Sequence, residues 1–443
     1  MLRSMLLYSA ELLALAAICF ALLRVQIPRV LQWAVVVYGV GAYLAVTVLD
    51  FPVSDQLGSV DLAHFWSAGR ALWEGLSPYA NSDTLNPPTA APFLLFFGAV
   101  NLPVAAMIWI PLNAVGGLLL VPLAQWVLSV LAPGEWKLPA PLVGLFAVDV
   151  ALSYANRSGM IGGQFSCLVA LALMGAVVSQ ARRRQVSAGV FLAIATVKTG
   201  LMVPFLLLFH RRTDLRAVAT LSVCCLALCF FAWPPTRIPH LCRECLNKIA
   251  AFSERGAEND YSYENRHKAY VDILGFDHLM YRMGMRDRMA IRIGQYAALL
   301  VLGAWVARQV LGPNPLSPAA GCSLVAIYST VFLYHRLCDT IILSLPLMYA
   351  VGSALAETGK ARIAFTLCTA AILGILSLRY RMLANLTDLY ADSTSVEGRL
   401  IQALVLPYGT WLVMLAMGFL ALAESWRRAV DRPLAALAAA GTT

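Results

Sequence analysis

Long runs of apolar residues alternate with short polar segments along most of this chain. A helix needs about 20 apolar residues to cross the hydrocarbon core of a bilayer. With a window of that length, roughly eleven to thirteen candidate membrane helices can be counted, including short ones. The pattern therefore predicts an all-α, polytopic membrane protein with one transmembrane domain over residues 1–443. The first run, which follows a basic residue and shows no clear cleavage site, is interpreted as a retained anchor.

Two polar segments interrupt this pattern, at residues 50–88 and 234–288, and five apolar elements follow between residues 289 and 423. Within the first segment, apolar residues recur every three to four positions between residues 60 and 75, which indicates a short amphipathic helix. Gly75 is its expected end. A helix so short and so rich in aromatic residues is expected to lie along the membrane interface.

The basic clusters predict the orientation of the chain. Arg182, Arg183 and Arg184 form the strongest cluster and are expected on the cytoplasmic side, together with the basic residues near 360 and 427. A second cluster at residues 210–212 follows only one span-length later. Either the intervening segment is a hairpin of two half-length helices broken near residues 198–200, or one cluster departs from the rule. The loops 50–88 and 234–288 and residues 334–336 are expected on the opposite, extracytoplasmic face.

The composition supports a membrane protein and argues against nucleic-acid binding. The chain is 60% hydrophobic and 13% charged, against about 25% charged residues in soluble domains. The net charge of +9 is explained by Lys and Arg at the ends of spans, so nucleic acid is not an expected partner. Most of the ten cysteines lie in apolar runs. Cys242 and Cys245 form a lone CxxC, for which a local disulfide and, less favoured, zinc remain alternatives.

Asp61 is the first candidate for chemistry. It begins the amphipathic helix, where an aspartate serves as an N-cap or as a general base at the mouth of a cavity. The two roles are compatible. His64 lies one turn further along the same helix and is most simply a hydrogen-bonded interfacial histidine.

Lys198 stands in an apolar segment, where its ammonium must find a partner or reach water, so it is either a phosphate contact or a snorkelling lysine. His335 and Arg336 begin a span on the face of the polar loops and are candidate phosphate contacts or an ordinary helix-end pair. Asp339 follows one turn later and could orient His335. Neither GxxxxGK[ST] nor a GxGxxG turn occurs, so no nucleotide cofactor is expected, and no metal is assigned.

Several motifs occur together in an order that resembles a known family. Asp61-Leu-Ala-His-Phe-Trp66 is followed by Gly75-x-Ser-Pro-Tyr79 and by Pro87-Pro88. Gly163-Gln164 precedes a span, and Lys198 and His335 come later. This order resembles the GT-C class of membrane glycosyltransferases, which includes the polyprenyl-phosphate-mannose-dependent α-mannosyltransferases of bacterial envelopes. Asn86 stands where the family pattern has an aromatic residue, and His335 lies in YHRLCD instead of a tryptophan-containing motif.

The resemblance implies a GT-C-like fold in the bacterial plasma membrane with an extracytoplasmic active site. A polyprenyl-phosphate sugar, most often mannose, would be the donor, and an envelope glycolipid or glycan the acceptor. Asp61 would deprotonate the acceptor hydroxyl in an inverting displacement. Lys198, His335 and Arg336 would stabilise the leaving phosphate. The remaining candidate cavity residues are His64, Tyr79, Gln164 and Asp339.

Other classes of function are also compatible with a polytopic membrane protein. A transporter or flippase of a lipid-linked or small polar substrate would suit the broken helices and Lys198, although no inverted repeat is evident. An O-antigen-type polymerase or ligase and a non-catalytic assembly subunit are further alternatives. The missing nucleotide motif and the clustering of polar loops on one face favour the glycosyltransferase.

Overall fold

The structure is a computed structural model, and it describes residues 2–50, 61–80, 83–133, 138–264, 272–333, 335–377, 390 and 395–440. The predicted all-α membrane architecture is confirmed: helices dominate, and the strands among the described residues form one two-stranded antiparallel ribbon. Parts of the two predicted polar segments, residues 51–60, 81–82 and 265–271, lie outside the described residues.

The helices follow one another with short connections. In the N-terminal half they are α1 (Leu2–Leu22), α2 (Arg29–Asp50), α3 (Asp61–Trp73), η2 (Pro88–Ala90), α4 (Ala91–Gly98), α5 (Leu102–Leu131), α6 (Ala140–Leu152), α7 (Tyr154–Gly162), α8 (Ser166–Ala181), α9 (Gln185–Ala195), η3 (Thr196–Lys198), α10 (Thr199–Phe205), η4 (Leu206–Leu208) and η5 (Arg212–Asp214). In the C-terminal half they are α11 (Leu215–Ala232), η6 (Pro235–Arg237), α12 (Ile238–Phe252), α13 (Phe276–Arg282), α14 (Arg288–Leu311), α15 (Pro318–Ser329), η8 (Leu337–Leu343), α16 (Ser344–Ala356), α17 (Gly359–Ser377), α19 (Val396–Leu400), η9 (Ile401–Val405) and α20 (Tyr408–Ala440). The strands are β1 (Ile273–Leu274) and β2 (His335–Arg336).

Within the described residues, nine stretches are long and apolar enough to cross a membrane, or up to ten if the bent pair α7–α8 counts as one span. The eleven to thirteen candidates counted from the sequence also included short ones. Three of these are short apolar helices in the structure: η2–α4, which was expected to be short, and α6 and α15. A helix of 12 residues rises only ~18 Å and does not cross a hydrocarbon core of ~30 Å.

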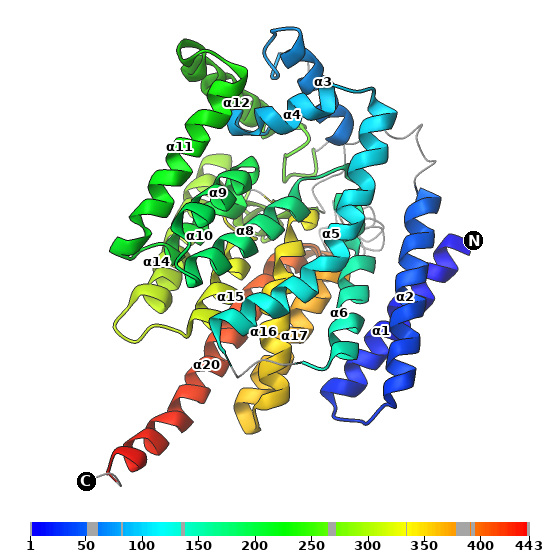
Figure 1. The fold of residues 1–443 in the computed structure, drawn as a ribbon, viewed down its shortest axis with the longest axis vertical. Helices are drawn as coiled ribbons and strands as arrows, with labels where there is room; N and C mark the ends of the chain where they lie inside the picture. Colours follow the sequence, from blue (N-terminus) through cyan, green and yellow to red (C-terminus); the bar gives the residue numbers. More distant parts are fainter. Residues whose placement is uncertain are drawn as a thin grey trace.

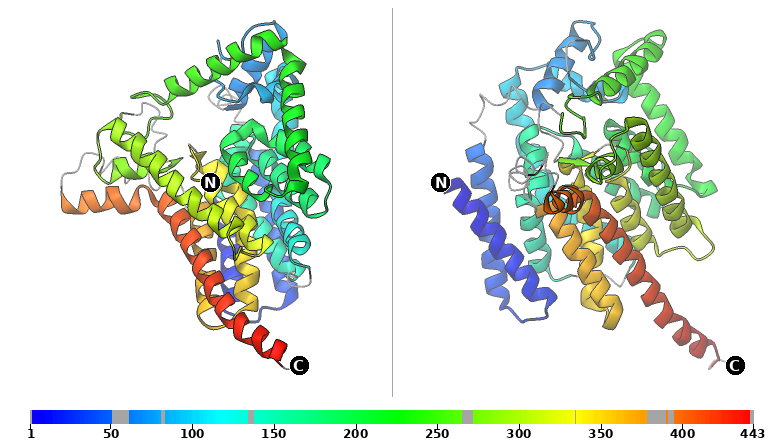
Figure 2. Two further views of the ribbon diagram at one scale, coloured as in Figure 1. Left: turned by 90° about the vertical axis from the view of Figure 1, so that its left-hand side faces the viewer. Right: turned by 180° about the vertical axis from the view of Figure 1, so that it is seen from behind.

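The polar segments gather at one end of the molecule. Figure 1 shows α3, α4 and α12 at the top, while the α1–α2 link and the end of α20 lie at the bottom. The right-hand view of Figure 2 shows α1 and α2 beside the main bundle, and both views show α20 running away from it. Arg24 donates to the Leu355 carbonyl and Arg362 to the Leu22 carbonyl. The basic residues at these helix ends therefore share one end of the molecule.

One of these nine stretches, residues 185–208 between the two basic clusters, folds back on itself and so does not cross as a single straight helix. Gln185 at its start donates to Asp214 over 3.2 Å, and Gln180 donates both to the Leu208 carbonyl over 2.7 Å and to Asp214. A straight helix of 24 residues would separate its ends by ~36 Å, so both ends can reach Asp214 only if the segment turns. The turn is at Lys198, whose φ of −124° and ψ of 79° are not helical. The hairpin alternative is therefore the observed one, and both basic clusters lie on the same side.

The short amphipathic helix α3 is confirmed and is packed tightly on α4. A Cβ atom at Gly69 would lie 1.9 Å from the Leu94 carbonyl oxygen and 2.7 Å from the Gly98 nitrogen, so the two backbones are in contact. Trp66 donates through Nε1 to the Val100 carbonyl, which helps to fix the crossing. The helix ends before Gly75, which has a φ of 74° and a Schellman-type pattern of hydrogen bonds.

Candidate active site

A cavity of about 350 Å³ is lined by residues of both polar segments, together with residues of the helices beneath them. Its walls come from the start of α3, the segment before η2, the end of α12, the tip of the 185–208 hairpin, and β2 with η8. Lys198 at the hairpin tip and strand β2 interrupt the helical path of the chain, and such breaks are tolerated at membrane depth where the backbone lines a cavity. Seven of the eight predicted site residues line it: Asp61, His64, Gln164, Lys198, His335, Arg336 and Asp339.

Asp61 is the first residue of α3 and is half-buried on the cavity wall. Its Oδ2 accepts a hydrogen bond from Nε2 of Gln164. Gln164 follows the tight turn between α7 and α8, where Gly163 has a φ of 73°. A Cβ atom at Gly163 would lie 2.5 Å from Cβ of Leu62, so a glycine is needed for this turn to approach α3. The Gly-Gln motif thus places an amide donor against the Asp61 carboxylate.

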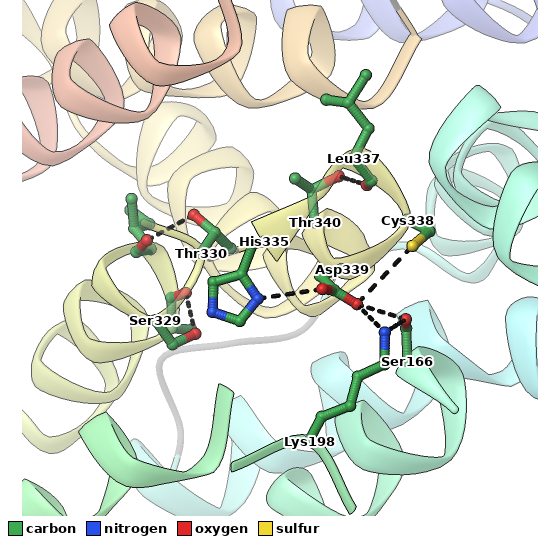
Figure 3. Close-up of polar contacts among 11 residues, drawn as sticks. Ser166, Lys198, Ser329, Thr330, His335, Leu337, Cys338, Asp339 and Thr340 are labelled. Carbon is green, nitrogen blue, oxygen red and sulfur yellow. Dashed lines mark hydrogen bonds and ion pairs between the residues drawn. The ribbon is translucent and has the colours of Figure 1, made fainter. Parts of the chain in front are cut away.

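Asp339 joins two of the predicted cationic residues in one buried network (Figure 3). Its Oδ1 lies 2.5 Å from Nζ of Lys198, and its Oδ2 lies 3.0 Å from Nδ1 of His335. Ser166 at the start of α8 completes the network, because it donates to Asp339 over 2.6 Å and accepts from Lys198 over 3.0 Å. Lys198 therefore does not snorkel away. It is held at the hairpin tip by a carboxylate 141 residues along the chain.

Two donor positions in this network have no protein partner among the described residues. An ammonium has three N–H donors, and Lys198 uses two of them, for Asp339 and Ser166. Nε2 of His335 is buried without a hydrogen-bond partner in the described part of the chain. The ring fits closely against Gly200, where a Cβ atom would lie 2.9 Å from Cε1 of His335. Both side chains line the cavity.

Arg336 is placed by the large polar segment. In the β1–β2 ribbon, Ile273 pairs with Arg336 and Leu274 with His335. The guanidinium donates to Glu258 over 2.5 Å and to Asn259 over 3.1 Å. Described residues of the 234–288 segment therefore pack against β2 and fix the position of Arg336 on the cavity wall.

The mouth of the cavity carries a second group of charges. Asp83 lies 3.2 Å from Nζ of Lys248 and 3.9 Å from Nδ1 of His64, and its side chain is 51% exposed. Tyr79, the eighth predicted residue, is not part of the lining. Its buried hydroxyl donates to the carbonyl of Asn86 over 2.8 Å and so shapes the segment before η2. Burial raises the pKa of the Tyr79 hydroxyl.

Some residues of the cavity carried no clear sequence signal. Ser166 is a small polar residue at the start of an apolar helix, and Glu258 and Asn259 lie in a long segment with mixed charge. Asp83 resembled an ordinary turn residue. Cys245 also lines the cavity, and both Cys242 and Cys245 are free thiols in the structure. In the described part of the chain, no group of three or more His, Cys, Asp or Glu residues is arranged to hold a metal.

The fold and this site define a class of protein: an integral membrane protein whose polar cavity, formed by broken helices, combines a carboxylate with a lysine, a histidine and an arginine. The family model of glycosyltransferase family 87 matches residues 85–334, and the chain belongs to this family. It is therefore a membrane glycosyltransferase of the GT-C type. The matched region includes Gln164 and Lys198, begins after Asp61 and ends directly before His335. No curated protein and no solved structure gives a significant match to the chain.

Proposed function

We propose that this glycosyltransferase transfers a sugar, most simply mannose, from a polyprenyl-phosphate donor to a hydroxyl group of an envelope glycolipid or glycan. The acceptor oxygen attacks the anomeric carbon, the bond to the phosphate oxygen breaks, and polyprenyl phosphate leaves. A single displacement of this kind inverts the anomeric centre. Family membership favours this activity over the transporter alternative.

The pairing of the cavity carboxylates is the observation that supports Asp61 as the general base. Among the described residues, four carboxylates line the cavity. Asp83, Glu258 and Asp339 each lie within 3.2 Å of a lysine or arginine nitrogen. The hydrogen-bond partner of Asp61 within the described residues is the neutral amide of Gln164. Asp61 thus has no lysine or arginine within ion-pair distance among the described residues. Its bond to Gln164 engages Oδ2, and Oδ1 would face the acceptor hydroxyl.

The phosphate side of the reaction would lie against the Lys198–Asp339–His335 network. Asp339 holds the side chains of Lys198 and His335 in the wall before a donor arrives. A phosphate oxygen would take the remaining N–H of Lys198, and protonated His335 would donate through Nε2. Arg336, held by Glu258, adds a third cation to the same wall. Donors that are fixed in advance stabilise the charge that develops on the leaving phosphate.

The cavity also suits a lipid-linked donor better than a nucleotide sugar. Leu85, Val197, Ile249, Phe252 and Leu333 give it apolar walls next to the charged groups. Its volume of about 350 Å³ lies within the usual range of roughly 300–1,000 Å³ for small-molecule sites. We place this end of the molecule on the extracytoplasmic side of a bacterial plasma membrane, because the arginine clusters at residues 182–184 and 211–212 belong to the opposite end.

Reconstituted protein tests the donor class directly. Proteoliposomes would receive radiolabelled polyprenyl-phosphate mannose or a nucleotide-linked mannose, with an envelope lipid extract as acceptor. The proposal predicts that label moves to the acceptor fraction only from the lipid-linked donor and that the new linkage has the inverted anomeric configuration by NMR. Transfer from the nucleotide sugar alone would contradict the proposed donor, and a retained configuration would contradict the single displacement.

A further inference from the structure

A second cavity, of about 360 Å³, lies between α5, α8 and α9. We call it the α5–α8–α9 groove. Ser166 at the start of α8 belongs to the active-site network, whereas Arg182, directly after α8, belongs to this groove. A helix of 16 residues rises ~24 Å. The groove is therefore separated from the active-site cavity by the length of α8, and the proposed reaction does not use it.

The polar rim of the groove is formed by two arginines and two serines: Arg182, Arg184, Ser179 and Ser187. The Arg182 guanidinium lies over the Trp126 ring, 5.0 Å from its centroid. In the described part of the chain, neither Arg182 nor Arg184 makes an ion pair with a carboxylate. The nearby Asp214 instead bonds to glutamine side chains and a backbone amide. The rim thus presents two positive charges that no protein acid neutralises there.

The turn between α8 and α9 holds these arginines close together. Arg183 adopts a left-handed conformation with a φ of 58°, and the Arg183 and Arg184 amides donate to the carbonyls of Gln180 and Ser179. Glycine is the usual residue at such a position because it adopts this conformation without strain. The chain instead continues its run of arginines through the turn, which leaves Arg182 and Arg184 on the rim of the same groove.

The floor and walls of the groove are apolar and open towards the membrane. Its lining includes Leu123, Leu171 and Phe191, and the absence of a side chain at Gly175 leaves space beside the Phe191 ring. Val186 and Val190, one turn apart on α9 beside the groove, are 62% and 40% exposed. Exposed aliphatic residues on a span face lipid. A ligand of the groove would therefore present an anionic group to the arginines and a hydrocarbon chain to the walls.

We propose that the α5–α8–α9 groove binds one anionic phospholipid, with its phosphate between Arg182 and Arg184 and an acyl chain along Leu123, Leu171 and Phe191. Basic pockets between membrane helices are suited to anionic headgroups, since each cation near the surface contributes to lipid binding. The location of the groove beside the principal arginine cluster agrees with the anionic surface of a cytoplasmic leaflet. This site is independent of the proposed sugar donor.

Lipid titration of the delipidated full-length protein, followed by native mass spectrometry, tests the proposal. The probes are phosphatidylglycerol, zwitterionic phosphatidylcholine and inorganic phosphate. The double variant R182Q/R184Q should bind phosphatidylglycerol at least about tenfold more weakly than the wild type, as expected for two lost cations. The matched control R211Q/R212Q removes the same charge from the second basic cluster, outside the groove, and should bind it as the wild type does.

Other outcomes would overturn the proposal. One is that both double variants lose phosphatidylglycerol binding to the same extent. Another is that the wild type binds phosphatidylglycerol and phosphatidylcholine with equal affinity. A third is that millimolar inorganic phosphate displaces the lipid. Gly175→Leu provides a test if R182Q/R184Q does not fold. It leaves both arginines in place and fills the floor, because even a Cβ atom there would lie 3.1 Å from the Phe191 ring. Undiminished phosphatidylglycerol binding by this variant would contradict the acyl-chain part of the proposal.

Discussion

Replacement of Asp339 by asparagine is expected to destabilise the protein and to impair transfer. The carboxylate lies between Lys198 and His335, with a distance of 2.5 Å to Nζ of Lys198. The two side chains of that ion pair are only 15% and 8% exposed, so solvent screens the pair little. Removal of one partner from a buried pair costs about 3–5 kcal/mol, because the other charge is left uncompensated.

A second variant separates the structural effect from the catalytic one. In K198M/D339N no unpaired ammonium remains, so we expect its apparent midpoint of thermal unfolding to recover most of the several degrees lost in Asp339→Asn. Sugar transfer should stay low in both variants, since Lys198 loses its anchor in Asp339→Asn and is absent from K198M/D339N. The control is Asp83→Asn, which removes a half-exposed partner of Lys248 and should change stability by only ~0–1 kcal/mol.

Fluorescence-detected thermal unfolding in detergent, run beside the transfer assay, measures both quantities. The reasoning would be refuted by an Asp339→Asn midpoint equal to that of the wild type. If K198M/D339N transferred sugar at the wild-type rate, the network would have only a structural role, and Lys198 would not take part in the reaction.

Two further predictions concern the surroundings of the site. Burial raises the pKa of Asp272 to about 7, although Arg336 opposes the shift. Because the folded state then binds the proton more tightly than the unfolded state, the protein loses stability as the pH rises from about 4 to 7. Asp272→Asn should therefore raise the thermal midpoint at pH 8 and have little effect at pH 4, and an equal difference at both pH values would contradict this. Gly69→Ala places a Cβ atom against the Leu94 backbone and should lower both the midpoint and transfer by separating α3 from α4. Gly41→Ala, which meets no atom within 4 Å, is its control, and similar behaviour of the two variants would argue against the close contact.

Local patterns in the sequence predicted local structure well. The apolar stripe and Gly75 predicted the helix that runs from Asp61 to Trp73, because spacing and a stop residue are properties of a short segment. The conflict between two basic clusters identified a hairpin near Lys198 as one of two alternatives, since charge placement constrains topology. The apolar pattern did not separate long spans from the short apolar helices α6 and α15, because both are hydrophobic runs and differ mainly in length.

The contacts between residues of the site could not be predicted from local patterns. Lys198 and Asp339 are 141 residues apart, and Ser166 and Asp339 are 173 apart, so no local pattern links them. The sequence suggested that Asp339 orients His335, a helical-spacing argument, but gave no sign that the same carboxylate also holds Lys198. Tyr79 belonged to a motif near the cavity, yet its hydroxyl bonds to the protein's own backbone. The order of the motifs predicts which segments surround the cavity, whereas the direction of each side chain depends on how those segments pack.

The transfer rate of Asp61→Asn, compared with that of Asp83→Asn, tests the central claim most directly. Both substitutions neutralise a carboxylate of the same cavity, and asparagine preserves the size of each side chain. If Asp61 is the general base, its variant should remain folded, still bind the polyprenyl-phosphate sugar, and transfer it ~10²–10⁴-fold more slowly. Asp83→Asn should stay close to the wild type. Transfer at the wild-type rate by folded Asp61→Asn protein would contradict the account.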